Sequence, residues 1–143
     1  MPSSQPTLVP SSSPSFDGWG VQIGSNVDEF LTGASVDSSG DVYSVGYTSG
    51  NVFTTSAGGI DFWVSKVSGT DGSPVWGVQA GTNTDDAAYG IALDSSGDVL
   101  ICGRTLGSLY AAHVGSLDDY WVAKRSGPDG SLIWGVQLGT TGH

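Results

Sequence analysis

The chain has 143 residues, with 4 Lys and Arg against 14 Asp and Glu and a formal net charge of −10. So few basic groups argue against a nucleic-acid partner, because Lys and Arg supply the phosphate contacts that dominate such binding. The single cysteine, Cys102, excludes an internal disulfide framework. No apolar run approaches the roughly 20 residues of a membrane span, so none is expected.

Residues 1–18 are dominated by Pro and Ser and predict a disordered or extended linker. Too little apolar surface is present there to offset the entropy lost on ordering. The segment could be a stalk that carries O-linked sugar or a tail without a role, and both alternatives stay open. Met1–Ser15 lacks a basic region followed by an apolar core, so no secretory signal is expected in this chain.

From residue 19 the sequence repeats itself. The tetrapeptide Trp-Gly-Val-Gln begins at positions 19, 76 and 134, and Asp-Ser-Ser-Gly-Asp-Val begins at positions 37 and 94. The spacing is 57 residues and then 58 for the first marker, and 57 for the second. A fixed period of this length is the signature of a repeat architecture.

Each unit predicts four short strands in a meander. In the first unit these are 31–37, 42–48, 61–68 and a last strand that contains Trp76; in the second they are 87–94, 99–105, 119–126 and a strand that contains Trp134. Ser-Ser-Gly and Asp-Gly-Ser segments between them supply turns, with Gly at positions that need a positive φ. The segments 49–60 and 106–118 differ between the units and predict variable loops, where binding specificity would be located.

The apolar runs Phe62-Trp63-Val64 and Tyr120-Trp121-Val122 do not alternate with polar residues. Such runs predict strands that are covered on both faces, as when one sheet stacks on the next. Helical periodicity is missing, so we predict an all-β fold of four-stranded antiparallel propeller blades.

These motifs resemble the SBBP-type beta-propeller repeat family. The resemblance rests on Gly33–Thr48 followed by Asp61–Lys66 and Trp76, and again on Gly90–Thr105 followed by Asp119–Lys124 and Trp134. The family implies blades, often in large secreted or surface proteins, so an extracellular or cell-surface location is an expectation. It brings no agreed catalytic residues to carry over.

The copy number departs from a closed propeller, which usually needs about four to eight blades. We predict one orphan strand at 19–24, a first blade at about 31–81 and a second at about 87–139. An incomplete ring would leave exposed sheet faces and an unpaired strand. Either the chain is a piece of a longer protein, which we favour, or several copies assemble into a ring through these faces.

Acidic residues are the first candidate site. Asp37 and Asp41, like Asp94 and Asp98, could be Ca²⁺ ligands, but Asp residues at a tight turn more often bond their own backbone. Three adjacent acidic pairs could do acid–base chemistry or hold a cation: Asp28-Glu29, Asp85-Asp86 and Asp118-Asp119. Neighbouring residues in a strand point to opposite faces, so we expect no catalytic pair.

The lysines and tryptophans that recur at repeat positions are further candidates. Lys66 and Lys124 recur at one repeat position, which predicts a structural ion pair with Asp rather than catalysis. The five tryptophans could stack on sugars, but their regular recurrence predicts packing between blades: Trp19, Trp63, Trp76, Trp121 and Trp134.

Cys102 could be a nucleophile, but its counterpart is Val45, so we expect a small buried apolar position. His113, His143 and Arg104 form no recognisable catalytic grouping. We therefore predict a non-enzymatic scaffold or interaction module without cofactor or metal and with an unidentified protein or glycan partner. The alternatives are part of a carbohydrate-active propeller enzyme, or a Ca²⁺-dependent surface module.

Overall fold

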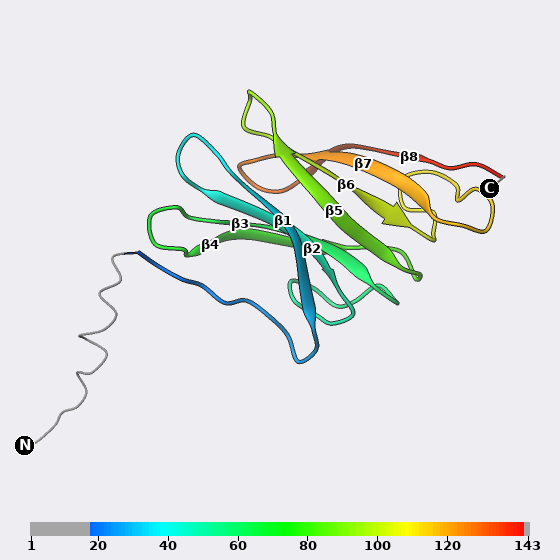
Figure 1. Cartoon of the computed structure of the whole chain (residues 1–143), viewed down its shortest axis with the longest axis horizontal. Coiled ribbons are helices and arrows are strands. Elements are labelled where there is room, and N and C mark those ends of the chain that lie inside the picture. The colour runs from blue at the N-terminus through cyan, green and yellow to red at the C-terminus, as the bar shows by residue number, and fades with distance from the viewer. Residues whose placement is uncertain (1–17, 142–143) are drawn as a thin grey trace, which may run out of the picture.

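The computed structural model describes residues 18–141, and its regular elements there are all β-strands. Two four-stranded antiparallel sheets lie one after the other along the molecule, and the described chain begins beside the first sheet and ends beyond the second (Figure 1). The all-β prediction is confirmed. The Pro/Ser-rich linker predicted at 1–18 lies outside the described residues except for Gly18, and so does His143.

Each sheet is a meander whose spatial order follows the chain. The first sheet contains β1 (Glu29–Val36), β2 (Val42–Thr48), β3 (Asp61–Val67) and β4 (Pro74–Ala80). The second contains β5 (Asp86–Leu93), β6 (Val99–Thr105), β7 (Asp119–Arg125) and β8 (Leu132–Leu138). Both sheets have a bulge in the first strand and another between the third and fourth strands, so the irregularities repeat with the sequence.

The Asp-Ser-Ser-Gly-Asp turns explain why the first two strands of each sheet form a hairpin. Gly40 has a φ of 86° and Gly97 a φ of 82°, a left-handed conformation that glycine adopts without steric cost. The Asp37 carboxylate accepts hydrogen bonds from the backbone N–H groups of Ser39 and Asp41, at 2.9 and 3.0 Å. The contacts that form both turns are therefore local, because they involve only residues of the turn itself.

The core lies between the two sheets. It contains Tyr43, Val45, Phe62 and Val64 from the first sheet and Ala88, Val99, Ile101, Trp121 and Ala123 from the second. The rings of Phe62 and Trp121 pack at 4.7 Å between centroids, with neither ring more than 1% exposed. The two sheets therefore stack face to face, which is the arrangement of neighbouring propeller blades.

Residues 19–24 were predicted to form a strand, and this is a correction: they pair with neither sheet and have no strand assignment. The sequence pattern is that of β4, but the three strands that would supply the ladder partners are not among the described residues. A single strand without partners cannot form sheet hydrogen bonds, so the segment crosses the first sheet as irregular chain.

Two predictions about burial in the second sheet are also corrected. Tyr120 was expected to be covered on its face of β7, yet it is 56% exposed, whereas its counterpart Phe62 is fully buried. Cys102 was expected to be buried like Val45, yet it is exposed. Both point away from the first sheet, and no further sheet covers that side within residues 18–141.

Candidate functional site

The Trp-Gly-Val-Gln marker joins one sheet to the next. The indole Nε1 of Trp76 donates a hydrogen bond to the carbonyl oxygen of Gly127 at 2.8 Å. Its ring lies so close to Gly130 that a Cβ there would come 2.7 Å from Trp76 Cε3. Gly130 also has a φ of 77°, so both space and backbone require glycine. The tryptophan of one sheet thus docks on the turn between β7 and β8 of the other.

Gln79, the last residue of the marker, fastens the loop that follows β2. Its Oε1 accepts hydrogen bonds from the backbone N–H groups of Val52 and Phe53, at 2.8 and 3.2 Å. Its Nε2 donates to the Gly50 carbonyl at 2.7 Å and to Asp61 Oδ2 at 2.9 Å. Gln137 makes the equivalent bonds in the second sheet, to the loop around Tyr110 and to Asp119.

The glycine of the marker leaves room for an aromatic ring from that loop. A Cβ on Gly77 would overlap the ring of Phe53, and a Cβ on Gly135 would overlap the ring of Tyr110. The sequence reasoning predicted variable loops at 49–60 and 106–118 and missed these contacts. The signal was present, because Phe53 and Tyr110 lie 57 residues apart, at the period of the repeat.

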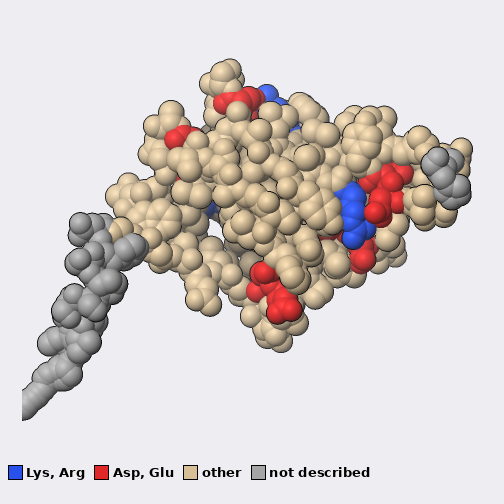
Figure 2. All heavy atoms as spheres, viewed as in Figure 1, with Lys and Arg blue, Asp and Glu red and all other residues tan. Residues whose placement is uncertain are grey.

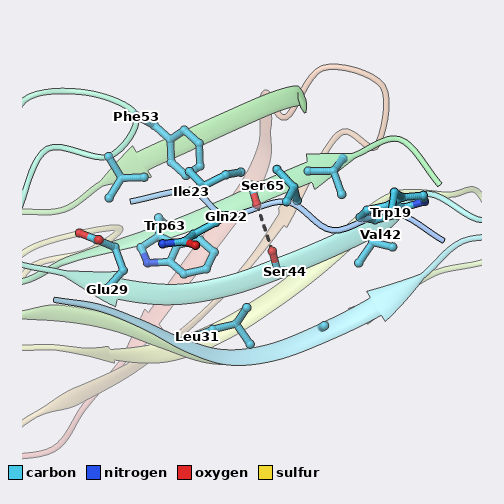
Figure 3. A pocket seen from close by; sticks show the side chains of 14 residues that line it. Trp19, Gln22, Ile23, Glu29, Leu31, Val42, Ser44, Phe53, Trp63 and Ser65 are labelled. Carbon is cyan, nitrogen blue, oxygen red and sulfur yellow. Dashed lines mark hydrogen bonds between the residues drawn. The ribbon is translucent and has the colours of Figure 1, made fainter. Parts of the chain in front are cut away.

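We call the side of the first sheet that is turned away from the second sheet the N-face, with Val42, Ser44, Trp63, Ser65 and Val67. Residues 19–24 cross it, as Figure 3 shows, with Trp19 at the Val42 end. Trp19 Nε1 donates to the Gly69 carbonyl at 2.9 Å, and its ring would collide with a Cβ on Gly72. Trp19 therefore docks on the first sheet as Trp76 docks on the second.

A cavity of about 390 Å³ remains between this segment and the sheet. Its lining includes Val21, Gln22 and Ile23 of this segment, Leu31 of β1, Trp63 of β3 and Phe53 of the loop that follows β2. Figure 3 shows Ile23 beside Phe53 and Leu31 on the far side of Trp63. At the interface between the two sheets the equivalent space is filled by side chains of β2 and β3. The cavity therefore lies where a further sheet stacked on the N-face would place the side chains of its second and third strands.

We call the opposite, outward side of the second sheet the C-face. It carries Leu100, Cys102, Tyr120, Val122, Trp134, Val136 and Leu138. These are the repeat counterparts of the first-sheet residues that pack on the second sheet. Trp134, Val136 and Leu138 are 43%, 43% and 51% exposed. The C-face is thus a contiguous apolar surface whose counterpart in the first sheet is covered, and an exposed patch of this kind marks an interaction surface.

The candidate calcium ligands are engaged by lysine. Lys66 Nζ lies 3.4 Å from Asp41 Oδ2 and 3.9 Å from Asp37 Oδ2, and Lys124 Nζ lies 2.8 Å from Asp94 Oδ2 and 3.8 Å from Asp98 Oδ2. An ammonium group occupies the position between the carboxylates that a bound cation would need. Among residues 18–141 no group of three or more His, Cys, Asp or Glu side chains has the geometry to hold a metal ion.

These ion pairs alter the titration of their groups. The hydrogen bond from Lys124 lowers the pKa of Asp94, and backbone N–H donors add to the effect. The same contact with Asp94 raises the pKa of Lys124. Burial opposes charging of Lys66, but its contacts with Tyr43 and Asp41 outweigh this and raise its pKa. The pairs are therefore charged across the neutral range, and they hold the hairpin turn against the third strand.

In two of the three acidic pairs the neighbouring carboxylates have different partners. Asp85 accepts a hydrogen bond from the Ile60 N–H at 3.1 Å, whereas Asp86 accepts from Thr82 N at 2.6 Å and from the Thr105 hydroxyl. Glu29 repeats the second arrangement, accepting from Ser25 and Thr48. Asp118 forms an ion pair with Arg104 at 3.0 Å, while Asp119 accepts from Gln137. The carboxylates of Asp85 and Asp86, and those of Asp118 and Asp119, therefore share no hydrogen-bond partner.

The remaining candidates are dispersed. Trp63 and Trp121 occupy the same position in β3 and β7 and are 7% and 0% exposed. His113 Nε2 lies 3.0 Å from the Leu117 carbonyl oxygen, within its own loop. Cys102 and Arg104 lie two residues apart on the outward side of β6, where Arg104 is engaged by Tyr89 and Asp118, and His113 lies in the loop that follows this strand. Within the part of the chain that is described, no helix is long and apolar enough to cross a membrane.

Sequence comparison relates part of the chain to a known repeat. No curated protein matches the chain at a significant level. A family model described as a beta-propeller repeat (SBBP) matches residues 75–111, which run from β4 across β5 and β6 into the following loop. The matched segment includes the Trp76 marker, which contacts the second sheet, and the Asp94 turn, which forms the hairpin between β5 and β6. The expected resemblance is confirmed for this segment: residues 75–111 are similar to the SBBP beta-propeller repeat.

Proposed function

We propose that this chain is a non-enzymatic scaffold and interaction module, which binds protein by stacking sheet against sheet. One observation carries the proposal: the N-face and the C-face each have the docking elements of the buried interface between the two sheets. Trp134 corresponds to Trp76, and Gly69 corresponds to Gly127, the acceptor of the indole hydrogen bond. An exposed tryptophan flanked by apolar residues is the composition of an interface core.

The distribution of polar groups supports the non-enzymatic part of the proposal. Gln79, Asp61 and Lys66 have the same partners as Gln137, Asp119 and Lys124. Groups that repeat in both units with the same partners serve the framework, since a catalytic set is needed only once. The outer parts of the loops 49–60 and 106–118 are exposed and differ between the units, so specificity for a partner would be located there.

An extended variant tests the stacking function. Residues 81–138 are repeated after Leu138, so that a third sheet follows β8 through the connection that joins β4 to β5. We expect the added sheet to cover the C-face, because a short connection gives a high effective concentration. The thiol of Cys102 should then be protected from a thiol reagent while its copy in the third sheet stays reactive, and the melting temperature should rise.

The matched control is the same extension with Trp134→Ala at the junction, which removes the docking indole. Protection of Cys102 should be largely lost in this control. If both thiols of the extended variant react as fast as Cys102 in the original chain, and its melting temperature is unchanged, the stacking function is contradicted.

A further inference from the structure

The inference drawn here rests on the proposed stacking function and names the partner. We infer that the C-face of one copy binds the N-face of a second copy, head to tail, and that residues 19–24 are an internal competitor for the same site. The interface between β1–β4 and β5–β8 within one chain is the template for this contact.

Tryptophan docking is the first part of the template. In one chain Trp76 reaches the Gly127 carbonyl of the next sheet, and Trp134 occupies the same position in β8. In a second copy the turn that would accept Trp134 contains Gly69 and Gly72, and in the structure Trp19 of the same chain is bound there. Trp134 of one copy and Trp19 of the other therefore require the same carbonyl group, and only one of them can be bound at a time.

Apolar packing is the second part. Phe62 packs against Trp121 between the sheets, and their counterparts are Tyr120 on the C-face and Trp63 on the N-face. The cavity of about 390 Å³ over Trp63 has no side chain of residues 19–24 filling it. Leu100, Tyr120 and Val122 of a second copy lie at the repeat positions whose side chains fill the equivalent space between β1–β4 and β5–β8. A second copy therefore covers the N-face more completely than the internal segment does.

Charge sets the conditions for this contact. Each copy has a net charge of −10, so two copies repel each other at long range. Figure 2 shows that the acidic side chains form small separate groups on the face in view and that much of the surface there is uncharged. The C-face has Lys124 at its border, paired with Asp94 and Asp98. Added salt screens the long-range repulsion and leaves the apolar contact in place, so association should strengthen as salt is raised.

The polar pair of Ser44 and Ser65 distinguishes the N-face from its counterpart. Their hydroxyl groups are hydrogen-bonded at 3.0 Å, at positions where the second sheet has Ile101 and Ala123. Because the two hydroxyl groups satisfy each other, the N-face can be covered by apolar side chains without leaving them unpaired. The same pair makes this face less apolar, which weakens association relative to the contact within one chain.

The test compares four forms of the full chain by light scattering and sedimentation over a range of concentrations: wild type, Trp19→Ala, Trp134→Ala and the double variant. Trp19→Ala frees the docking site. The concentration at which half of the chains are associated should therefore be about tenfold or more lower than for wild type, because an anchoring tryptophan dominates such an interface. Trp134→Ala should stay monomeric. The double variant is the matched control and should also stay monomeric, because its N-face is free but its C-face lacks the indole.

A mixture identifies the contact directly. Wild type has an intact C-face and an occupied N-face, whereas the double variant has a free N-face and an inactive C-face. We expect the mixture to form a dimer of one wild-type and one double-variant chain that does not grow further, with Cys102 of the wild-type chain protected from a thiol reagent. Circular dichroism confirms that each variant is folded, and Trp19→Phe, which removes the indole donor to the Gly69 carbonyl but keeps an aromatic ring, replaces Trp19→Ala if that variant is not.

The inference is overturned if Trp19→Ala associates no more than wild type, or if the double variant associates as strongly as Trp19→Ala, which would indicate non-specific adhesion. The extended variant of the preceding subsection separates the two proposals. If its third sheet covers Cys102 but no variant associates, the stacking function stands and the second copy is rejected. If neither occurs, both are rejected.

Discussion

Trp76 in β4 and Gly127 in the following sheet are joined by an indole hydrogen bond of 2.8 Å, and this bond is the link from one blade to the next. The contact occurs once between the two sheets, and it is repeated by Trp19 with Gly69. Trp134 has the same sequence context and no turn to contact within residues 18–141. The same tetrapeptide therefore has three different environments, and substitutions in it should have three different effects.

Replacing Trp76 by Ala should lower the free energy of unfolding by about 2–4 kcal/mol, because a large partly buried ring and a hydrogen bond are both lost. Replacing Trp134 by Ala should change it by less than about 0.5 kcal/mol, since the ring is 43% exposed. Urea unfolding of the two variants, at a concentration where the chain is monomeric, measures the difference. Equal losses would show that Trp76 does not couple the sheets.

The stability of the fold should depend on the side-chain amide of Gln79. Gln79→Glu replaces the donor to Asp61 Oδ2 by a carboxylate beside a fully buried carboxylate. We expect a loss of about 2–3 kcal/mol at pH 7, from an unpaired buried acceptor and like charge. The penalty should shrink in acid, because protonation of the introduced carboxyl group removes its charge and restores a hydrogen-bond donor.

Thermal unfolding of Gln79→Glu at several pH values checks this. Gln22→Glu is the matched control, because Gln22 has the same place in the marker but is exposed. A comparable loss at Gln22 would mean that the effect is one of net charge and not of the loop anchor.

The glycine of the marker gives a second matched pair. Gly77→Ala should displace the ring of Phe53 and cost about 1–3 kcal/mol, as overpacking does in a well-filled core. Gly20→Ala should be tolerated, because a Cβ at that position meets no atom within 4 Å. Limited proteolysis of the loop 49–60, together with urea unfolding, measures both effects. An unaltered loop in Gly77→Ala would show that Phe53 does not anchor it.

The ion pair of Asp94 and Lys124 should give a pH-dependent contribution. The folded-state pKa of Asp94 is lowered, so its stabilising effect is present above its unfolded pKa of about 3.9 and is lost as the pH falls through the lower folded value. Wild type should therefore melt at a higher temperature than Asp94→Asn at pH 7, and the gap should close in acid below about pH 4. Asp28→Asn, which removes an exposed carboxylate, is the control for net charge. A gap that persists at low pH would contradict the assigned role.

Much of the fold follows from local sequence signals. The positive-φ glycines, the Asp turns and the strand patterns predict two four-stranded sheets, and the structure has them within two residues at most strand ends. The prediction of a strand at 19–24 was wrong because sheet hydrogen bonds need partner strands, which no local sequence pattern supplies. The predictions that Cys102 and Tyr120 are buried were wrong for a related reason, because a repeat position is buried only where a neighbouring sheet covers it.

The sequence by itself determined the repeat, the strand order within each unit and the structural character of the repeated Asp and Lys residues, because these depend on local geometry and on a period visible in the chain. Only the tertiary structure decided which of the equivalent surfaces are covered. Trp19, Trp76 and Trp134 have the same tetrapeptide, yet Trp76 lies between two sheets and Trp134 is exposed, since burial depends on which sheets are neighbours and the tetrapeptide does not encode its neighbours. The same reason accounts for the N-face, the C-face and the cavity above Trp63.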